Sequence, residues 1–264
     1  MSSQNTTVVK SLTILNLFLE HDRLTLNEMV HLTNSPKTSV FRMVKSLEQM
    51  GFLDKDETGK YSLGLLFLQF GHLVRDRLSI RQVALPVMQK LRDQVGEAVN
   101  LIVRDHFEAV YVEKVDTIHP VRIYNEHPGR RVPMYAGACP RILLSFMSKA
   151  EQETYFRNVV LLPIGRGTIT DVGQLRAALD AAKDNGYTVS HSELQDDTSA
   201  VAAPIFDHAG DMVAGLSIAG LSTRFGDDVL PSLIERVKEA ARQCSSLLGY
   251  QVTPVNQFGA FNTV

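Results

Sequence analysis

Apolar residues recur at intervals of three and four positions near the N-terminus, at Val40, Met43, Val44, Leu47 and Met50. This spacing places them on one face of a helix. Ser35 is suited to cap the N-terminus of that helix, and Pro36 is suited to its first position, where a missing N–H costs no hydrogen bond. Gly51 suits the left-handed position just after the end. The pattern therefore predicts a helix with marked ends.

The opposite face of this helix carries cations and hydroxyl groups: Lys37, Thr38, Ser39, Arg42, Lys45 and Ser46. No acidic residue precedes Glu48 on it. A short helix with an apolar back and a donor-rich front suits the major groove of DNA. The alternative is a solvated helix on any globular protein, because basic faces are common.

The segments before the helix favour the first interpretation. Residues 25–33 predict a second short helix, in which Thr25 and Glu28 fit a capping box. Only Thr33, Asn34 and Ser35 separate it from the basic helix, as in a helix-turn-helix. Residues 8–20 predict a third helix that closes a small core.

A hairpin is predicted after the three helices. Strand-like pieces at residues 52–54 and 60–63 flank the turn signal Asp56-Glu57-Thr58-Gly59. Three helices and a hairpin form a winged helix-turn-helix. Its candidate DNA-binding residues are Lys37, Thr38, Ser39, Arg42, Lys45 and, from the hairpin, Lys60.

The next segment, residues 65–78, predicts a helix with more apolar residues than one narrow face can hold. We expect it to bury two sides, against its partner domain or against a second subunit. An ordinary core helix is the alternative. Residues 79–95 predict another helix, which Pro86 should break or kink.

Beyond Gly96 the pattern predicts a strand meander with helices at both ends, an α+β arrangement. A third strand is expected at residues 121–124 and a loop at 127–133. From Gln251 the chain is polar without periodicity, which is typical of disorder. The other predicted elements are strands at 98–103, 109–115, 187–190, 199–206 and 212–219, and helices at 139–148, 151–158, 172–185 and 227–248.

The composition is that expected of a soluble globular protein, with 264 residues that are 44% hydrophobic and 21% charged. Residues 1–78 carry nine Lys or Arg and eight Asp or Glu, a net +1, whereas residues 79–264 carry 18 and 21, a net −3. Neither half is a polycation, so DNA affinity must come from local charge placement and from dimerisation.

The sequence also predicts the cellular compartment of the protein. Cys139 and Cys244 form no disulfide-scaffold pattern, and the polar N-terminus has no signal-peptide core. No apolar run reaches the ~18 residues that a membrane span needs. We therefore expect a cytoplasmic protein with no membrane partner.

Many of these segments resemble the IclR family of bacterial transcription regulators, and the likeness extends to about Gly249. The resemblance implies an α+β fold with a winged helix-turn-helix at residues 1–64, a linker helix that contributes to dimerisation at 65–78, a GAF-like effector-binding domain at 79–250 and a polar tail at 251–264. The segments that carry it are residues 9–12, 24–28, 36–42, 47–53, 61–64, 96–99, 111–115, 129–134, 168–171, 186–187 and 201–207.

No catalytic motif is evident. The sequence holds no Walker loop, dinucleotide fingerprint, Gly-x-Ser-x-Gly elbow or zinc-ligand spacing, and we expect neither a cofactor nor a metal. His191 and Glu193 share a face of a predicted strand and could bind a ligand hydroxyl. An exposed strand end is the favoured interpretation of these two residues.

A candidate effector site begins at Ala136-Gly137-Ala138, before the helix that starts near Cys139. Small residues let a ligand approach the backbone, and the helix start offers free amides and a partial positive charge to a carboxylate. Pro140 stands where the family usually has glycine, and Arg141 replaces a usual lysine and keeps the charge. The alternative is that the small residues only let the helix pack closely on the sheet.

The resemblance places the opposite wall of the pocket at residues 198–201 and Ser217. Ala200 stands where many members have cysteine, and Ser190 where some have an acid, so the ligand of a better-known member cannot be carried over. Residues 121–124 and 134–141 resemble repressors of sugar-acid catabolism, such as that of the 2-keto-3-deoxygluconate genes. The candidate effector-binding residues are Gly137, Ala138, Cys139, Arg141, Ser190, Thr198, Ala200 and Ser217.

The leading hypothesis is a DNA-binding transcription regulator, a repressor, whose affinity for a double-stranded operator is controlled by a small organic or sugar acid. We expect a homodimer or a dimer of dimers, because one small domain with few phosphate contacts binds DNA weakly. The alternative is an enzyme that acts on a small acid and carries an appended DNA-binding domain. An acid/base pair in one pocket would favour the enzyme, and the sequence reveals none.

Overall fold

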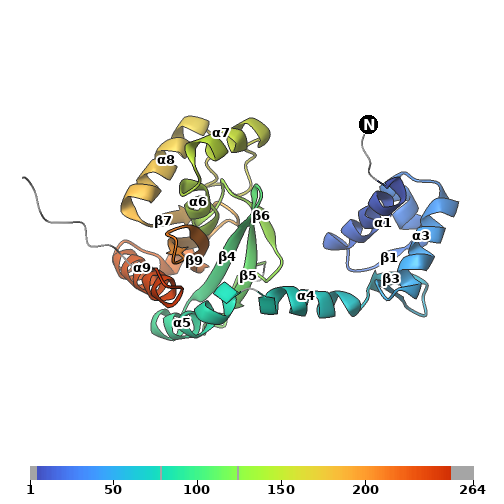
Figure 1. Cartoon of the computed structure of the whole chain (residues 1–264), viewed down its shortest axis with the longest axis horizontal. Helices are drawn as coiled ribbons and strands as arrows, with labels where there is room; N and C mark the ends of the chain where they lie inside the picture. The colour runs from blue at the N-terminus through green and yellow to red at the C-terminus, as the bar shows by residue number, and fades with distance from the viewer. Residues whose placement is uncertain (1–4, 78, 124, 251–264) are drawn as a thin grey trace, which may run out of the picture. The chain divides into compact units, whose positions relative to one another are not determined.

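The computed structural model describes residues 5–77, 79–123 and 125–250. Its contacts divide the chain into two compact units, residues 1–77 and 78–264 (Figure 1). No helix in the described part is long and apolar enough to serve as a membrane span.

The N-terminal unit is a small helical domain with a three-stranded antiparallel sheet in the order β1-β3-β2. Its core gathers side chains from all three helices and the wing, among them Ile14, Met29, Val40 and Leu53. The elements are α1 (Thr6–Asn16), η1 (Leu17–Leu19), β1 (Leu24–Thr25), α2 (Leu26–Thr33), α3 (Lys37–Gln49), β2 (Leu53–Lys55), β3 (Lys60–Leu63) and α4 (Leu66–Arg77). The predicted winged helix-turn-helix is therefore formed.

The helix ends of this unit follow the sequence signals in part. In α2 the capping box is present, with the Thr25 N–H donating to the Glu28 carboxylate at 2.7 Å. Helix α3 begins one residue later than predicted, since Pro36 is its N-cap and makes no side-chain hydrogen bond there. The hydroxyl of Ser35 donates instead to the Thr33 carbonyl at 3.1 Å. Gly51 has φ +76°, as its position after the helix requires.

Helix α4 packs one side against the wing. The ring of Phe52 lies 5.5 Å from Phe67 and 6.1 Å from Phe70, measured between centroids. The other side stays open within the N-terminal unit, because Leu68 is 72% exposed and Leu73 is 50% exposed. The second buried side that we expected is therefore not formed inside the N-terminal unit.

The C-terminal unit is built on an antiparallel sheet in the order β6-β5-β4-β9-β8-β7. Helices α5 and α9 pack on one face, and α6 packs on the other with α7 and α8 outside it (Figure 1). The elements are α5 (Ser79–Val95), β4 (Ala98–Asp105), β5 (Glu108–Val115), β6 (Arg131–Pro133), α6 (Ala138–Ser145), α7 (Lys149–Asn158), α8 (Val172–Asn185), β7 (Thr188–His191), β8 (Thr198–Phe206), β9 (Met212–Leu221), η2 (Ser222–Arg224) and α9 (Leu230–Leu247).

Two predictions for this unit are wrong. Residues 121–123 form no strand, and the edge strand is β6, inside the segment predicted as a loop. Strand pairing identifies β6 as the edge strand, because β6 pairs with β5 and its Val132 is buried, whereas Val121 is 58% exposed. Pro86 does not break its helix, since α5 runs without interruption from Ser79 to Val95, and the kink that we gave as the other outcome stays a prediction. Tyr124 and the predicted polar tail lie outside the described residues.

Candidate functional site

A small, partly open cavity lies between helix α6 and the sheet of the C-terminal unit. Seven of the eight predicted effector-binding residues line it: Gly137, Ala138, Cys139, Ser190, Thr198, Ala200 and Ser217. Its volume of about 30 Å³ suffices for roughly two water molecules. An organic ligand therefore needs part of the wall to move.

The eighth predicted residue, Arg141, lies behind this wall and pairs with a buried carboxylate. Its guanidinium contacts the Glu193 carboxylate and also donates to the Val189 carbonyl. The same carboxylate accepts the Gly137 N–H at 2.8 Å, and Arg141 and Glu193 are each 5% exposed. An internal carboxylate thus already binds the start of α6, where we expected free amides for a ligand.

Glu193 also differs from its predicted surroundings. Strand β7 ends at His191, and Ser192 has φ +52°, so the chain turns and directs the next side chain inward. Glu193 is therefore a buried partner of α6 and not part of an exposed strand end. His191 stays exposed, and its Nδ1 lies 2.8 Å from the Ser199 hydroxyl.

Part of the predicted helix terminus remains open to a ligand. Ala138 and Cys139 are in the first turn of α6, where helix geometry supplies no partner for their amides. Pro140 has no N–H to offer. The start of α6 thus provides two amides and the positive end of the helix dipole.

Close packing also requires small residues here. Gly137 has φ +89°, and a Cβ at that position would lie 2.7 Å from Cδ1 of Leu194. A Cβ on Gly215 of β9 would lie 2.5 Å from Sγ of Cys139. The packing interpretation of the small residues therefore has direct support, while the ligand interpretation stays a prediction.

The sheet side of the cavity carries polar groups that the sequence analysis missed. Asn100 pairs in register with Ser217, so both side chains lie on the same face of the sheet. The amide nitrogen of Asn100 donates to Glu126 at 2.9 Å, while its Oδ1 is buried without a hydrogen-bond partner. A polar residue inside the apolar run of β4 is the sequence signal that could have identified this position.

Burial also affects the ionisable groups of the cavity. Burial raises the pKa of the Cys139 thiol, against a smaller opposing effect of its hydrogen bond with Ser217. Burial likewise raises the pKa of Glu126, which its hydrogen bond with Asn100 lowers in part. The thiol is therefore protonated at neutral pH and serves as a weak hydrogen-bonding group.

An open depression adjoins the cavity. It has a volume of about 430 Å³ and is lined by Lys114, Asp116, Arg122, His127 and Pro128, together with Ile123 and Glu126. Ile123 and Glu126 also line the inner cavity, so they form the wall between the two spaces. Movement of this wall would join them.

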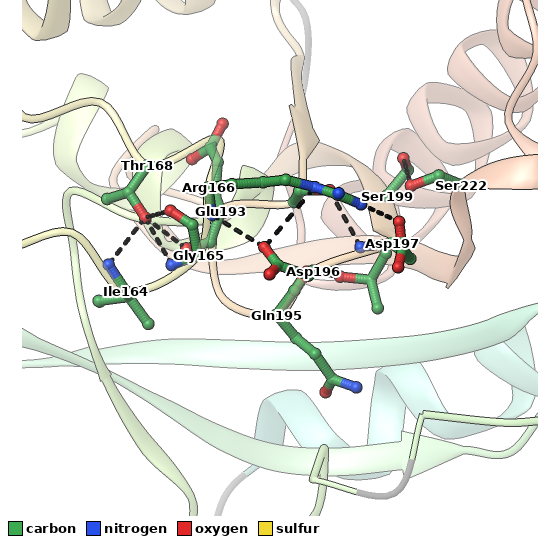
Figure 2. A network of polar contacts seen from close by, with 12 residues as sticks. Ile164, Gly165, Arg166, Thr168, Glu193, Gln195, Asp196, Asp197, Ser199 and Ser222 are labelled. Atoms are coloured by element: carbon green, nitrogen blue, oxygen red, sulfur yellow. Dashed lines mark hydrogen bonds and ion pairs between the residues drawn. The ribbon is translucent and has the colours of Figure 1, made fainter.

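A second segment holds the loop that carries Glu193 (Figure 2). The N–H of Gly165 donates to the Glu193 carbonyl at 3.0 Å, and the Thr168 hydroxyl donates to the same carbonyl at 2.7 Å. Arg166 reaches Asp196 through its backbone N–H at 2.9 Å and Asp197 through its side chain. The backbone of the Glu193 loop is thereby fixed from outside, whereas Ile123 and Glu126 are the lining residues that also face the open depression.

In the N-terminal unit, the predicted DNA-binding residues separate into two groups. Thr38, Ser39 and Arg42 line a groove with residues of α1 that the sequence analysis missed: Thr6, Thr7, Lys10 and Ser11. Lys37 is exposed at the start of the same helix. The groove presents hydroxyls and two cations, as phosphate contacts require.

Lys45 and Lys60, like Lys37, are not part of the lining of this groove. Lys45 forms an ion pair with Glu48 at 2.9 Å, which raises the pKa of Lys45. Lys60 is exposed on β3. Phe41, 46% exposed, lies on the solvent side of α3 and is a further residue that the sequence analysis missed. An exposed aromatic ring there suits contact with a thymine methyl group.

The described residues contain no group of three or more His, Cys, Asp or Glu side chains that could hold a metal ion.

Known proteins match most of the chain, including both units. Residues 7–57 match the IclR helix-turn-helix domain, and residues 72–246 match the bacterial transcriptional regulator IclR C-terminal model. The HTH-type transcriptional regulator KipR of Bacillus subtilis (strain 168) is 55% identical over 250 residues, covering 95% of this chain and 100% of that protein.

More distant relatives also match most of the chain. The HTH-type transcriptional regulator KdgR of Escherichia coli (strain K12) is 27% identical over 248 residues, covering 94% of both chains. The crystal structure of the Thermotoga maritima IclR is 29% identical, with a TM-score of 0.75, and the match covers 93% of this chain and 99% of that one.

Proposed function

Because the chain belongs to the IclR family of bacterial transcriptional regulators, we propose that an effector bound in the cavity of the C-terminal unit controls its operator affinity. The protein is a regulator with a DNA-binding helix-turn-helix domain and a C-terminal effector-binding domain. The proposed domains are residues 1–64 for DNA binding, 65–78 for the linker helix, 79–250 for the effector and 251–264 for a polar tail. Helix α4 itself groups with the N-terminal unit.

The small cavity beneath α6 is the observation that supports this proposal most directly. It brings together polar side chains and the start of α6, yet its volume of about 30 Å³ is too small for an organic molecule. A ligand that enters must therefore stabilise a more open arrangement of the wall. A ligand shifts an equilibrium only if it binds two states unequally, and in this proposal it binds the more open state of the cavity.

The proposed effector is a small organic or sugar acid. The amides of Ala138 and Cys139 are placed to bind its carboxylate, because Glu193 already occupies the Gly137 amide. The sugar-acid type remains a proposal, because identity to KdgR is 27% while identity to KipR is 55%.

The proposed DNA contacts are Lys37, Thr38, Ser39, Arg42, Lys45 and Lys60. Thr38, Ser39 and Arg42 have the best support, since they share a groove with Lys10. Lys45 contributes less, because Glu48 already compensates its charge. In the proposed mode of action the effector-free protein binds the operator as a repressor, and the effector releases it.

We also propose a homodimer or a dimer of dimers. The exposed side of α4, with Leu68 and Leu73, supplies an apolar surface that a second copy would cover. Two linked winged helices would also double the number of phosphate contacts.

Binding measurements on one cavity variant test the proposal. In Ala200→Leu, the added side chain should fill the cavity and weaken the binding of any stabilising acid at least tenfold. Affinity for an operator selected from random DNA should stay within about twofold of wild type when no acid is present. The matched control is Ala209→Leu, in the exposed turn between β8 and β9. Unchanged acid binding in Ala200→Leu would place the effector elsewhere.

A further inference from the structure

We propose that the effector of this cavity carries a nitrogen donor, an ammonium or N–H group, which binds the Glu126 carboxylate and the Oδ1 of Asn100. The effector would then be an amino acid or a related nitrogen-bearing acid. This inference rests on the proposed function, because it assigns a ligand class to the same cavity.

Glu126 is the first reason. Its side chain is half-buried and lines the cavity, and none of the ion pairs among the described residues includes it, although a desolvated carboxylate is usually paired. The neighbouring cations have other partners. Lys114 contacts Asp116 at 2.9 Å and the Ile123 carbonyl at 3.0 Å. Arg130 lies over the Tyr111 ring, 5.6 Å from its centroid.

Asn100 is the second reason, and it is independent of charge. The residue is 1% exposed, and its Oδ1 has no hydrogen-bond partner, which leaves an acceptor unsatisfied in the interior. Its register with Ser217 places it on the cavity face, and its amide nitrogen contacts Glu126. One ligand donor between these two side chains would satisfy the free acceptor and the carboxylate together.

The charges around the cavity favour nitrogen over a hydroxyl group. Glu193 pairs with Arg141, whereas no ion pair among the described residues includes Glu126. A ligand with only a carboxylate would bring a second acid beside this unpaired one. An ammonium would favour the ionised form of Glu126, whose pKa burial raises, and would form a charge-assisted hydrogen bond, which is about twice as strong as a neutral one. Its carboxylate can still contact the amides of Ala138 and Cys139.

The position of Glu126 also gives such a ligand a path. Glu126 and Ile123 form the wall between the inner cavity and the open depression that Lys114, Asp116 and Arg122 line. A zwitterion meets both signs of charge in this depression before it reaches the wall. Binding of its nitrogen to Glu126 would then act on the part of the boundary that must move.

Matched sets of small acids test this inference on the full-length protein. We would measure the thermal midpoint with alanine, lactate and pyruvate, and with glutamate, 2-hydroxyglutarate and 2-oxoglutarate. In at least one set the amino compound should raise the midpoint more than its hydroxy and oxo partners. If no amino compound exceeds its partners, the inference is overturned.

Calorimetry on Glu126→Gln then tests the residue. The affinity for the stabilising amino compound should fall at least tenfold, while Asp116→Asn in the outer depression should leave it within about threefold. Asn100→Leu provides a second variant, with an expected loss of at least threefold. Retention of wild-type affinity in the folded variants would overturn the assignment.

The outcomes separate this inference from the function beneath it. If a hydroxy or oxo acid binds best and Ala200→Leu abolishes its binding, the nitrogen donor is refuted and the effector cavity stands. If an amino compound binds equally well to wild type, Ala200→Leu and Glu126→Gln, the nitrogen-donor inference and the effector cavity are both refuted.

Discussion

Helices α3 and α6 both begin without a side-chain cap from their own N-cap residue, yet their first turns meet different surroundings. The start of α3 is exposed, with Pro36 and Lys37 in solvent. The start of α6 is buried, and a distant carboxylate binds it. The open terminus suits DNA phosphate, whereas the closed terminus suits a small ligand only beside the internal acid.

This difference shows that a helix terminus can bind a ligand only where amides of its first turn and nearby charged groups lack a partner within the protein. At α6, Glu193 accepts the Gly137 N–H and pairs with the Arg141 guanidinium. The start of α6 therefore attracts a second anion less strongly than it would without Glu193. At α3 no side chain competes from the N-cap position. Four experiments would test this contrast.

The largest effect, on the free energy of unfolding, should come from replacing Glu193, the buried carboxylate at the start of α6. In Glu193→Leu the guanidinium of Arg141 would stay buried without its partner, which costs about 3–5 kcal/mol of unfolding free energy. Urea unfolding followed by circular dichroism measures this cost. The double variant Arg141→Met/Glu193→Leu should recover much of the loss. A single variant within ~1 kcal/mol of wild type would show that the pair does not hold α6 in place.

The second effect is on the DNA side. Arg42→Ala should weaken operator binding by about 1–3 kcal/mol and leave folding unchanged, because the side chain is exposed in a groove with Lys10. Lys45→Ala is the control and should cost less, since Lys45 is already paired with Glu48. Gel-shift titrations at one fixed salt concentration measure both. Equal losses would mean that the Lys45–Glu48 pair opens on DNA.

The contrast also shows which features the sequence could predict. The capping box of Thr25 and Glu28 was predicted because its partners lie three residues apart. The cap that Glu193 gives Gly137 spans 56 residues, and only the fold brings the two together. Periodicity found the helices and most strands, since each pattern is local to its element.

The edge strand was predicted at the wrong residues for the same reason, because local patterns do not show which distant segments pair. Residues 121–124 and β6 are both short segments with apolar positions, and only pairing with β5 selects the second. Small residues before a helix start predicted the α6 side of the cavity, and the family resemblance predicted the sheet side, but neither identified Glu126 in the lining or Asn100, which contacts it. Whether these residues bind an effector stays a prediction.

The third experiment adds a cap to the open terminus. Relative to Pro36→Ala, both Pro36→Asp and Pro36→Ser should raise the unfolding free energy by about 1 kcal/mol, since each can accept an amide of the first turn. Only the aspartate should also weaken operator binding, through repulsion of phosphate. Parallel stability and gel-shift measurements separate the two effects. Equal operator affinity of the Asp and Ser variants would place phosphate away from this terminus.

The smallest effect concerns α7, whose start carries an ordinary capping box between Ser148 and Glu151. Hydrogen bonds from Arg104 first, and then from Ser148, lower the pKa of Glu151 to about 2, against a usual 4.5. A lowered folded-state pKa adds stability above the unfolded pKa, and this stability is lost as pH falls from about 4.5 towards 2. The side chain is half-exposed, so we expect less than about 1 kcal/mol.

Thermal midpoints of wild type and Glu151→Gln would show this contribution as a difference that is constant between about pH 7 and 5.5 and shrinks below that range. Arg104→Gln should remove most of the pH-dependent part, because Arg104 is the largest cause of the shift. A wild-type advantage that persists unchanged at pH 3 would contradict the lowered pKa. Such a result would leave α7 with a cap that acts through the Ser148 hydroxyl alone, independent of charge.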